Sequence, residues 1–338
     1  MNRRKTARPG GRRRARHSLI GVVLLLCMTL PHLDQGDVRK DTARYAAVSL
    51  QMWETGDFLT PRLHPDTLYF KKPPLAFWMV GGVLKAAGTS LTAIRLPSVL
   101  AAALCVLVLV SVVRAFGSEA TAATAGIVLA LTMDFFRRTR EFSIDLWLLL
   151  FLLLAFRLAI AGARGRAGWL AASGASLGAA LLCKPLVALL ALPVLFACYD
   201  LFRPVRSRAW LLAAAAAALI VGGSWHVAAA AVHGDAFFVR YFGNELREHT
   251  AEAVAGEGIR PLYYLGVLGI AYWPWLAAVA AAAVPAFRGR FGARARRALA
   301  AAALWVLVWL AALSVFPQKE PQYALPLYPM LAWIAEAA

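Results

Sequence analysis

Residues 145–161 read DLWLLLFLLLAFRLAIA, an almost unbroken apolar run close to the roughly 20 residues that a membrane helix needs. Nine further apolar runs occur at 18–33, 96–113, 119–134, 168–183, 185–201, 209–232, 261–284, 298–315 and 323–338. The 338-residue chain is 61% hydrophobic and 16% charged, whereas a soluble domain is about half apolar and about a quarter charged. The pattern predicts an all-α polytopic membrane protein with about ten transmembrane helices, and it excludes a soluble enzyme.

The net charge of +18 divides according to the predicted topology. Lys and Arg are concentrated at 1–17, 164–166, 203–208 and 288–297, and the positive-inside rule places all four segments in the cytoplasm. Arg164 lies on the same side as the N-terminus only if the apolar stretch 74–88 does not cross. The predicted cytoplasmic segments then hold 20 Lys/Arg against three acids, and the outer ones 16 against 15. The basic excess therefore indicates orientation, and no nucleic-acid partner is expected.

The expected organisation is a basic cytoplasmic N-terminus, 1–17, followed by a single transmembrane domain, 18–338. No small-x-small cleavage site follows the first apolar run, so this run is interpreted as an uncleaved span rather than a signal peptide. The larger outer loops are 34–95, 135–144 and 233–260. Within the first loop, residues 41–56 have the periodicity of an amphipathic surface helix that ends at Gly56. The non-crossing stretch 74–88 is expected to form a second, interfacial helix.

The outer loops also carry many cations and several carboxylates, which suit a phosphate-bearing ligand at the boundary between lipid and water. Short motifs recur there in a defined order. The first loop contains DTARYA (41–46), GDFL (56–59) and YFKKPPL (69–75). Later motifs are RLPS (95–98), RT (138–139) before DL (145–146), KPL (184–186), YF (241–242), YWPW (272–275) and PQKEPQY (317–323).

In order and spacing these motifs resemble the D-E-x-R-Y-A, G-D-W and Y-F-E-K-P-P-L pattern of the polyprenyl-phosphate-sugar glycosyltransferases. That family includes the lipid A 4-amino-4-deoxy-L-arabinose transferases and is related to the protein O-mannosyltransferases. The resemblance implies a C-type glycosyltransferase fold with two juxtamembrane helices after the first span. It also implies an active site on the periplasmic face of the bacterial inner membrane.

The resemblance assigns Asp41 as the catalytic carboxylate of the first loop and Asp145 as the acid of the second. It implies that Arg44, Lys72 and Lys184 bind the phosphate of the lipid carrier. Further candidate site residues are Tyr45, Tyr69, Lys71, Glu245, His249 and Lys319.

Two positions depart from the family pattern. Thr42 and Lys71 stand where the pattern has glutamates. In the arabinose transferases the second of these glutamates can help to hold a metal ion. A lysine there disfavours a divalent metal without excluding it, and no cofactor is assigned. Glu245 and His249 share a helix face at i, i+4, a spacing that suits a metal but favours a solvated loop helix here. The chain also stops at Ala338 inside a predicted span, so a short or truncated relative is expected.

Each candidate also has a purely structural explanation. An acid at position 41 can stabilise the start of the surface helix, and lysines at 72 and 184 can anchor their side chains at the interface. The motif match favours a functional role at these three positions. Asp145 begins a span, where an acid suits the helix N-terminus, and its two interpretations stay open.

The leading hypothesis is an enzyme that moves a sugar from a polyprenyl-phosphate carrier to lipid A, another glycolipid or glycan, or a protein. Asp41 would deprotonate a hydroxyl acceptor or orient a phosphate acceptor, and the resemblance implies inversion at the sugar carbon. One alternative is a transporter or flippase for lipid-linked sugars, which the nearly uncharged span interiors disfavour. Another is an inactive relative that binds the carrier lipid, which the changes at Thr42 and Lys71 keep open.

Overall fold

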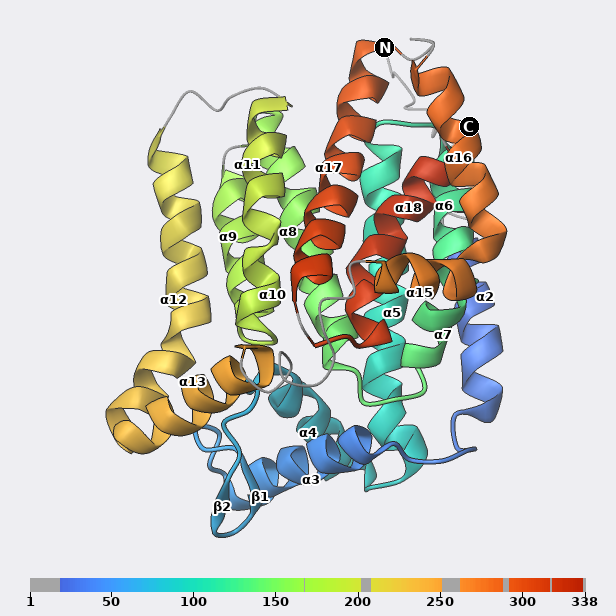
Figure 1. Ribbon diagram of the computed structural model, residues 1–338. Coiled ribbons are helices and arrows are strands. Elements are labelled where there is room, and N and C mark those ends of the chain that lie inside the picture. Colours follow the sequence, from blue (N-terminus) through green and yellow to red (C-terminus); the bar gives the residue numbers. More distant parts are fainter. Residues whose placement is uncertain are drawn as a thin grey trace, which may run out of the picture.

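A computed structural model describes residues 19–166, 168–201, 208–250, 262–287, 292–316 and 318–336, with only the backbone given for 199–201, 244–250, 283–287 and 294. These residues form a bundle of helices that stand side by side, with a group of shorter elements across one end (Figure 1). In the described part, strand structure is confined to β1 (Arg62–His64) and β2 (Thr67–Leu68), which pair antiparallel. The all-helical expectation therefore holds apart from this small hairpin.

Four helices of the described residues are long and apolar enough to cross a membrane. They are α5 (Leu91–Arg114), α8 (Ile144–Ala163), α12 (Arg208–His233) and α17 (Ala293–Val315). Three other predicted spans form the shorter helices α2 (Ile20–Thr29, followed by the 3-10 turn η1, Leu30–His32), α6 (Glu119–Ala130) and α9 (Gly168–Leu181). Helices of 10 to 14 residues rise only about 15–21 Å, less than the roughly 30 Å apolar core of a bilayer.

The remaining three predicted spans are not single helices. Span 185–201 forms α10 (Pro185–Leu189) and α11 (Ala191–Leu201). Span 261–284 forms α15 (Tyr263–Ala271) and α16 (Trp273–Phe287), which are bent by 105° and count as a fifth candidate span if taken together. Span 323–338 begins with the 3-10 helix η2 (Pro321–Leu327) and continues as α18 (Tyr328–Ala335).

Proline accounts for these breaks, because it lacks the amide hydrogen that would bond to the carbonyl four residues earlier. Pro193 lies in the first turn of α11, Pro274 is the second residue of α16, and Pro326 lies within η2. Apolar composition predicted these segments as spans, but it did not predict where the helices divide.

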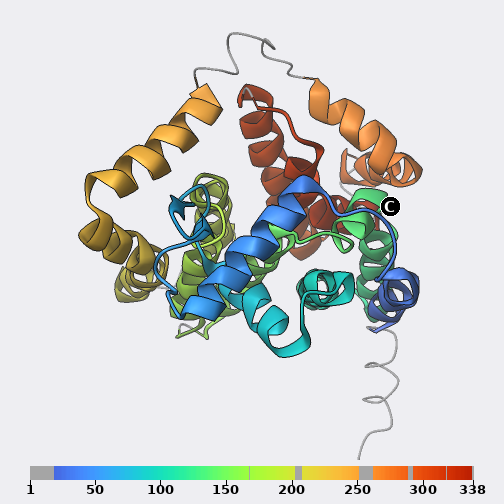
Figure 2. The same cartoon turned by 90° about the horizontal axis from the view of Figure 1, so that it is seen from below.

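The first outer loop forms a layer across one end of the bundle (Figures 1 and 2). The predicted surface helix is α3 (Lys40–Thr55), and it ends at Gly56, which has the left-handed φ of 71° that glycine accommodates. The stretch expected not to cross is α4 (Leu75–Ala87), which packs against α3 at this end. The helix α13 (Asp235–Thr250) and the short helix α7 (Met133–Arg138) lie at the same end.

Tight contacts hold α3 and α4 together within this layer. The indole nitrogen of Trp53 donates to the Trp78 carbonyl at 2.8 Å, and the indole nitrogen of Trp78 donates to the Phe58 carbonyl at 2.8 Å. A Cβ at Gly81 would come within 2.6 Å of the Ser49 carbonyl oxygen, so glycine permits the close approach of the two helices. The two helices are therefore closely packed, and α3 together with the segment before α4 supplies part of the cavity wall.

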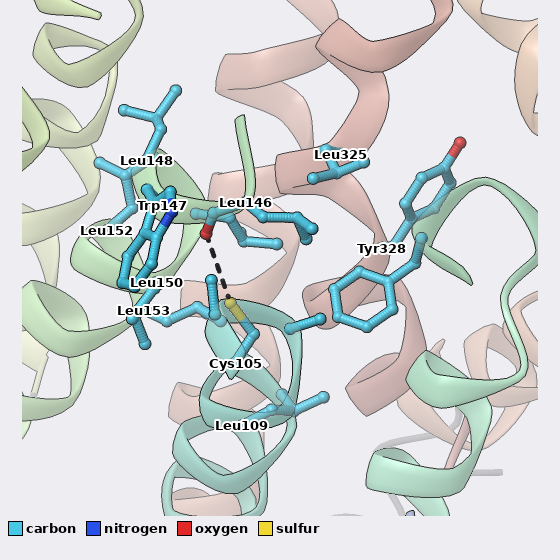
Figure 3. Packing of buried hydrophobic residues seen from close by; sticks show 14 of the residues in the cluster. Cys105, Leu109, Leu146, Trp147, Leu148, Leu150, Leu152, Leu153, Leu325 and Tyr328 are labelled. Atoms are coloured by element: carbon cyan, nitrogen blue, oxygen red, sulfur yellow. Dashed lines mark hydrogen bonds between the residues drawn. The ribbon is translucent and has the colours of Figure 1, made fainter. Parts of the chain in front are cut away.

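The larger of two apolar clusters joins α5, α8 and the C-terminal helices. Figure 3 shows Cys105 and Leu109 of α5 beside Leu146 of α8, with Leu325 and Tyr328 approaching from η2 and α18. A smaller cluster beside the hairpin ties the lower end of α12 to the first outer loop, and consists of Phe70, Leu182, Trp225, Ala229, Phe237 and Tyr241. Tyr69, Phe142 and Ile144 of the larger cluster also border an open space at the α3 end of the bundle.

Candidate active site

That space is a polar cavity of about 430 Å³ at the α3 end of the bundle. Its wall is built from α3, the segment before α4, the α7–α8 connection, the α9–α10 turn and the segment after α17. Eight of the residues singled out in the sequence line it: Asp41, Arg44, Tyr45, Tyr69, Lys71, Lys72, Asp145 and Lys184. Segments as far apart in the chain as Arg39 and Tyr323 thus meet at one site, although the role of each residue stays a prediction.

The start of α3 supplies the predicted catalytic acid. Asp41 is the second residue of the helix, and its Oδ1 accepts a hydrogen bond from Nη1 of Arg44 at 2.9 Å. The Asp41 side chain is 59% exposed, so it remains accessible from the cavity. Thr42, which stands where the family pattern has Glu, is buried and its Oγ1 accepts from the Phe142 amide at 3.2 Å. Thr42 therefore fastens α3 to the segment that precedes α8.

Tyr45 faces the cavity one turn further along α3. Its ring packs against Phe77 and Phe142 with ring centroids 5.8 and 5.6 Å apart. Burial, together with the negative charge that neighbouring groups such as Asp41 contribute, raises the pKa of the Tyr45 hydroxyl. Tyr45 therefore keeps its proton and is suited to donating a hydrogen bond rather than to acting as a base.

The segment with the paired lysines is held at both of its ends. The Tyr69 amide donates to the Pro61 carbonyl at 2.8 Å, and the Leu75 amide donates to the Leu182 carbonyl at 3.3 Å. Between them residues 71–74 contribute two half-buried lysines and two buried prolines. Because proline restricts the backbone, the lysines are presented on a stiff loop beside the α9–α10 turn.

Lys184, in that turn, pairs with Asp145. Lys184 Nζ lies 2.5 Å from Oδ1 of Asp145, and the two side chains are only 12% and 16% exposed. Nζ also lies 4.9 Å from the centre of the Tyr323 ring. Asp145 is in the first turn of α8, which Ser143 caps by accepting from the Leu146 amide at 3.3 Å. To bind a phosphate, Lys184 would therefore have to contact it in addition to Asp145 or give up the Asp145 contact.

A second group of charges on the wall was not among the predicted site residues. Arg138 of α7 is buried and lies 3.1 Å from Asp134 and 2.9 Å from Glu141, which in turn lies 2.8 Å from Arg39. Burial alone would lower the pKa of Arg138, but the Asp134 and Glu141 carboxylates outweigh it and raise that pKa. The sequence could have indicated these ion pairs, because Asp134 and Glu141 lie four residues before and three residues after Arg138.

One candidate site residue, Lys319 in the segment after α17, lies outside the cavity wall. Lys319 does not line the cavity; its Nζ donates to the carbonyls of Leu313 at 2.5 Å and Ser314 at 3.0 Å, so it caps the end of α17. Its burial lowers the pKa of the Lys319 ammonium. The residues of this segment that do line the cavity are Gln318, Glu320, Gln322 and Tyr323. Glu320 has extended backbone, in which side chains alternate, and that is why Lys319 points the other way from its neighbours.

The third-loop candidates Glu245 and His249 lie outside the side chains that the structure describes, although the backbone of α13 extends to Thr250. Among the described residues, no three His, Cys, Asp or Glu side chains are close enough to hold a metal ion.

An apolar groove of about 130 Å³ adjoins the cavity. The two spaces share Lys72, Lys184, Gln318 and Tyr323 as common wall. The rest of the groove is lined by the largely apolar residues Pro185, Leu186, Val187, Leu190, Tyr241, Phe242, Leu313 and Phe316 of α10, α13 and α17 and of the positions next to them. Two lysines thus stand where a polar space meets an apolar one.

Comparison with known proteins places this arrangement in a family. A family model described as dolichyl-phosphate-mannose-protein mannosyltransferase matches residues 71–242, just over half of the chain. The undecaprenyl phosphate-alpha-4-amino-4-deoxy-L-arabinose arabinosyl transferase of Pseudomonas aeruginosa is 28% identical over 325 residues. That match covers 93% of this chain but 58% of the relative. The enzyme of the same name from Serratia proteamaculans is 26% identical over 306 residues, covering 88% and 54%.

Solved structures agree on the fold. ArnT from Cupriavidus metallidurans bound to undecaprenyl phosphate has a TM-score of 0.80 at 22% identity, covering 95% of this chain and 59% of that chain. The archaeal oligosaccharyltransferase AglB from Archaeoglobus fulgidus has a TM-score of 0.58 at 13% identity, with 96% and 50% covered. This chain thus spans less than two thirds of each of these proteins. From the motif order, the fold and the family match together it follows that the chain belongs to the dolichyl-phosphate-mannose-protein mannosyltransferase family.

Proposed function

We propose that the chain is a glycosyltransferase that moves one sugar from a polyprenyl-phosphate carrier to an acceptor at the outer face of the inner membrane. The observation that carries this proposal is the wall shared by the polar cavity and the apolar groove. A polyprenyl-phosphate sugar has a polar head and a long apolar tail joined by a phosphate. The two spaces and the lysines between them match those three parts in order.

Charge on the shared wall supports this placement of the phosphate. Lys72 and Lys184 both border the groove and the cavity, and each carries an ammonium group suited to a phosphate oxygen. The groove beyond them is lined mainly by leucine, valine and aromatic side chains, so burying an isoprenoid tail there removes apolar surface from water. Arg44 lies on the cavity side, where it can assist the departing phosphate.

The chemical step follows from these positions. An acceptor hydroxyl attacks the sugar carbon, and the bond from that carbon to the phosphate oxygen breaks. The lipid phosphate leaves with the bonding electrons, and Lys72, Lys184 and Arg44 stabilise its charge. Asp41 takes the proton of the hydroxyl; with a phosphate acceptor, it orients the acceptor instead. Direct displacement inverts the configuration at the sugar carbon.

The same proposal places the molecule in the bacterial inner membrane. The ten predicted spans cross it, the short and broken helices included, with α3 and α4 on the periplasmic surface. The acceptor is lipid A, another glycolipid or glycan, or a membrane protein, and the bilayer itself is the third partner. The names of the relatives support a lipid-linked donor and leave the acceptor open.

The test uses the full chain in liposomes, with a labelled polyprenyl-phosphate sugar and membrane acceptors. Wild type is expected to transfer label. Asp41→Asn is expected to bind the carrier and to lose at least about 100-fold in rate, the usual scale for removing an acid–base group. Lys72→Gln is expected to weaken carrier binding about tenfold. Asp66→Asn, in the exposed hairpin turn, and Lys85→Gln, at the exposed end of α4, are matched controls that should leave both measurements unchanged.

Each other outcome has a definite meaning. Undiminished transfer by Asp41→Asn would remove that residue from its assigned role. Carrier binding without transfer to any acceptor would identify a binding protein instead of an enzyme. Movement of the intact labelled donor across the bilayer without transfer would support a flippase.

A further inference from the structure

The cavity wall carries more positive than negative charge. Seven basic side chains and four carboxylates line it among the residues that the structure describes. Three of the carboxylates, Asp41, Glu141 and Asp145, already form ion pairs with basic side chains of the same wall. A ligand that enters this space therefore meets a field that favours anions and disfavours an additional cation.

Lys71 lines the part of the cavity in which the proposed function places the sugar. Its neighbour Lys72 borders both the cavity and the apolar groove, whereas Lys71 borders the cavity alone. If the phosphate lies at Lys72 and the tail in the groove, the sugar lies in the cavity, on the side of Lys71. The loop that carries both lysines is held at Tyr69 and Leu75, so Lys71 cannot easily leave the cavity by a backbone movement.

We propose that this site selects a sugar without an ammonium group, either uncharged or acidic, and that Lys71 is the specificity-determining residue. The inference rests on the proposed function and adds the class of donor. The relatives described above are named for 4-amino-4-deoxy-L-arabinose, whose amine is protonated near neutral pH. An ammonium group in this cavity would be placed among like charges in a partly desolvated space, where they repel more strongly than in water.

A matched pair of donors isolates this effect. Both are polyprenyl-phosphate pentoses, one with an amine and the other with a hydroxyl at carbon 4, and polyprenyl phosphate alone serves as the reference ligand. Dissociation constants are measured for the full chain in nanodiscs at low and high salt. Wild type is expected to bind the hydroxyl donor at least about fivefold more tightly than the amino donor, with a smaller ratio at high salt.

Two substitutions assign the effect to one residue. Lys71→Glu is expected to abolish or reverse the preference, and Lys71→Gln is expected to give an intermediate ratio. Lys85→Glu makes the same charge change on an exposed residue outside the cavity and should leave the wild-type ratio intact. Binding of polyprenyl phosphate alone shows that each variant retains a working carrier site.

The outcomes separate this inference from the function on which it rests. Failure of wild type to bind polyprenyl phosphate overturns the proposed function. Normal carrier binding with equal or tighter binding of the amino donor overturns the donor class. A preference that persists in both Lys71 variants overturns the assignment to Lys71.

Discussion

The pair formed by Lys184 and Asp145 shows how one contact changes the interpretation of two residues. In the sequence, Asp145 begins a span and Lys184 lies between two spans, and each residue has a structural explanation of its own. In the structure they are bonded to each other on the cavity wall. A pair that is mostly buried stabilises the fold only while both partners remain, because either charge alone is poorly solvated. Under the proposed function, the same pairing competes with the carrier phosphate for Lys184.

This competition predicts opposite effects of two substitutions on carrier binding. Asp145→Asn releases Lys184 and is expected to tighten binding of polyprenyl phosphate about threefold, whereas Lys184→Gln is expected to weaken it about tenfold. Binding is followed by intrinsic tryptophan fluorescence, with Glu54→Gln on the exposed end of α3 as the control. Equal weakening by both substitutions would contradict the competition and indicate a purely structural pair.

Arg95 illustrates a second kind of residue effect, the support of the segment that leads into α3. Its buried guanidinium donates to the carbonyls of Leu33, Gln35 and Asp37 at 2.9, 2.6 and 3.0 Å, which holds the segment leading into α3. Arg95→Gln is expected to lower the free energy of unfolding by about 2–3 kcal/mol and to reduce transfer, because buried carbonyls lose a charged donor.

Thermal unfolding in detergent measures the loss at Arg95. Arg95→Lys, which keeps the charge, is expected to recover part of the stability and of the transfer rate. Arg240→Gln is the matched control, since exposed Arg240 makes one 3.4 Å bond to the Leu68 carbonyl. Its expected effect is below about 0.5 kcal/mol. An Arg95 variant as stable and active as wild type would show that the segment is held by other contacts.

At the scale of elements, α9 and α12 meet through small residues. A Cβ at Gly174 would lie 1.9 Å from the Ala214 carbonyl oxygen, and one at Gly178 would lie 2.7 Å from the Val221 side chain. Gly174 and Gly178 are spaced as in a G-x-x-x-G motif, which lets two membrane helices approach closely. Because α12 contributes Trp225 to the cluster beside the hairpin, this packing also affects the outer layer.

Gly174→Val is therefore expected to force α12 away from α9 and to lower the free energy of unfolding by about 1–3 kcal/mol or more. Gly223→Val introduces the same side chain on α12 at a position with nothing within 4 Å of the added Cβ, and it should be tolerated. Thermal unfolding in detergent compares the stability of the two variants. Equal stability of Gly174→Val and Gly223→Val would show that the helix contact is not tight in the membrane.

The elements also explain which site residues the motif pattern could and could not identify. The motif YFKKPPL identifies both lysines as cavity residues. The two prolines that follow restrict the loop, so a local motif is enough to fix where Lys71 and Lys72 lie. In PQKEPQY the motif does not distinguish Lys319 from its neighbours, whereas the extended backbone at Glu320 places Gln318 and Glu320 on the cavity wall and turns Lys319 away from it. Gln318, Glu320 and Gln322 were recognisable only once the helix was known to end at Val315.

At the scale of the whole molecule, orientation is the main expectation still to be tested. The hairpin turn lies at the α3 end of the bundle, and the α8–α9 connection lies at the other end (Figure 1). In a chain with Cys27→Ala, Asp66→Cys and Ser90→Cys are expected to react with a membrane-impermeant thiol reagent on intact spheroplasts. Arg166→Cys should react only after the membrane is opened. Labelling of all three from one side would overturn the topology, and with it the periplasmic site.

Much of the architecture was determined by the sequence alone. Apolar runs located the helices, and ordered motifs identified eight residues that line one cavity. Charge parity predicts that 74–88 does not cross the membrane, and this stays a prediction. These properties are local or additive along the chain. The tertiary structure decided the 105° bend at Tyr272, the bond between Lys184 and Asp145, and the wall that joins the cavity to the groove. The ion pair and the shared wall depend on where segments far apart in the chain meet, and no single stretch of sequence encodes such a meeting.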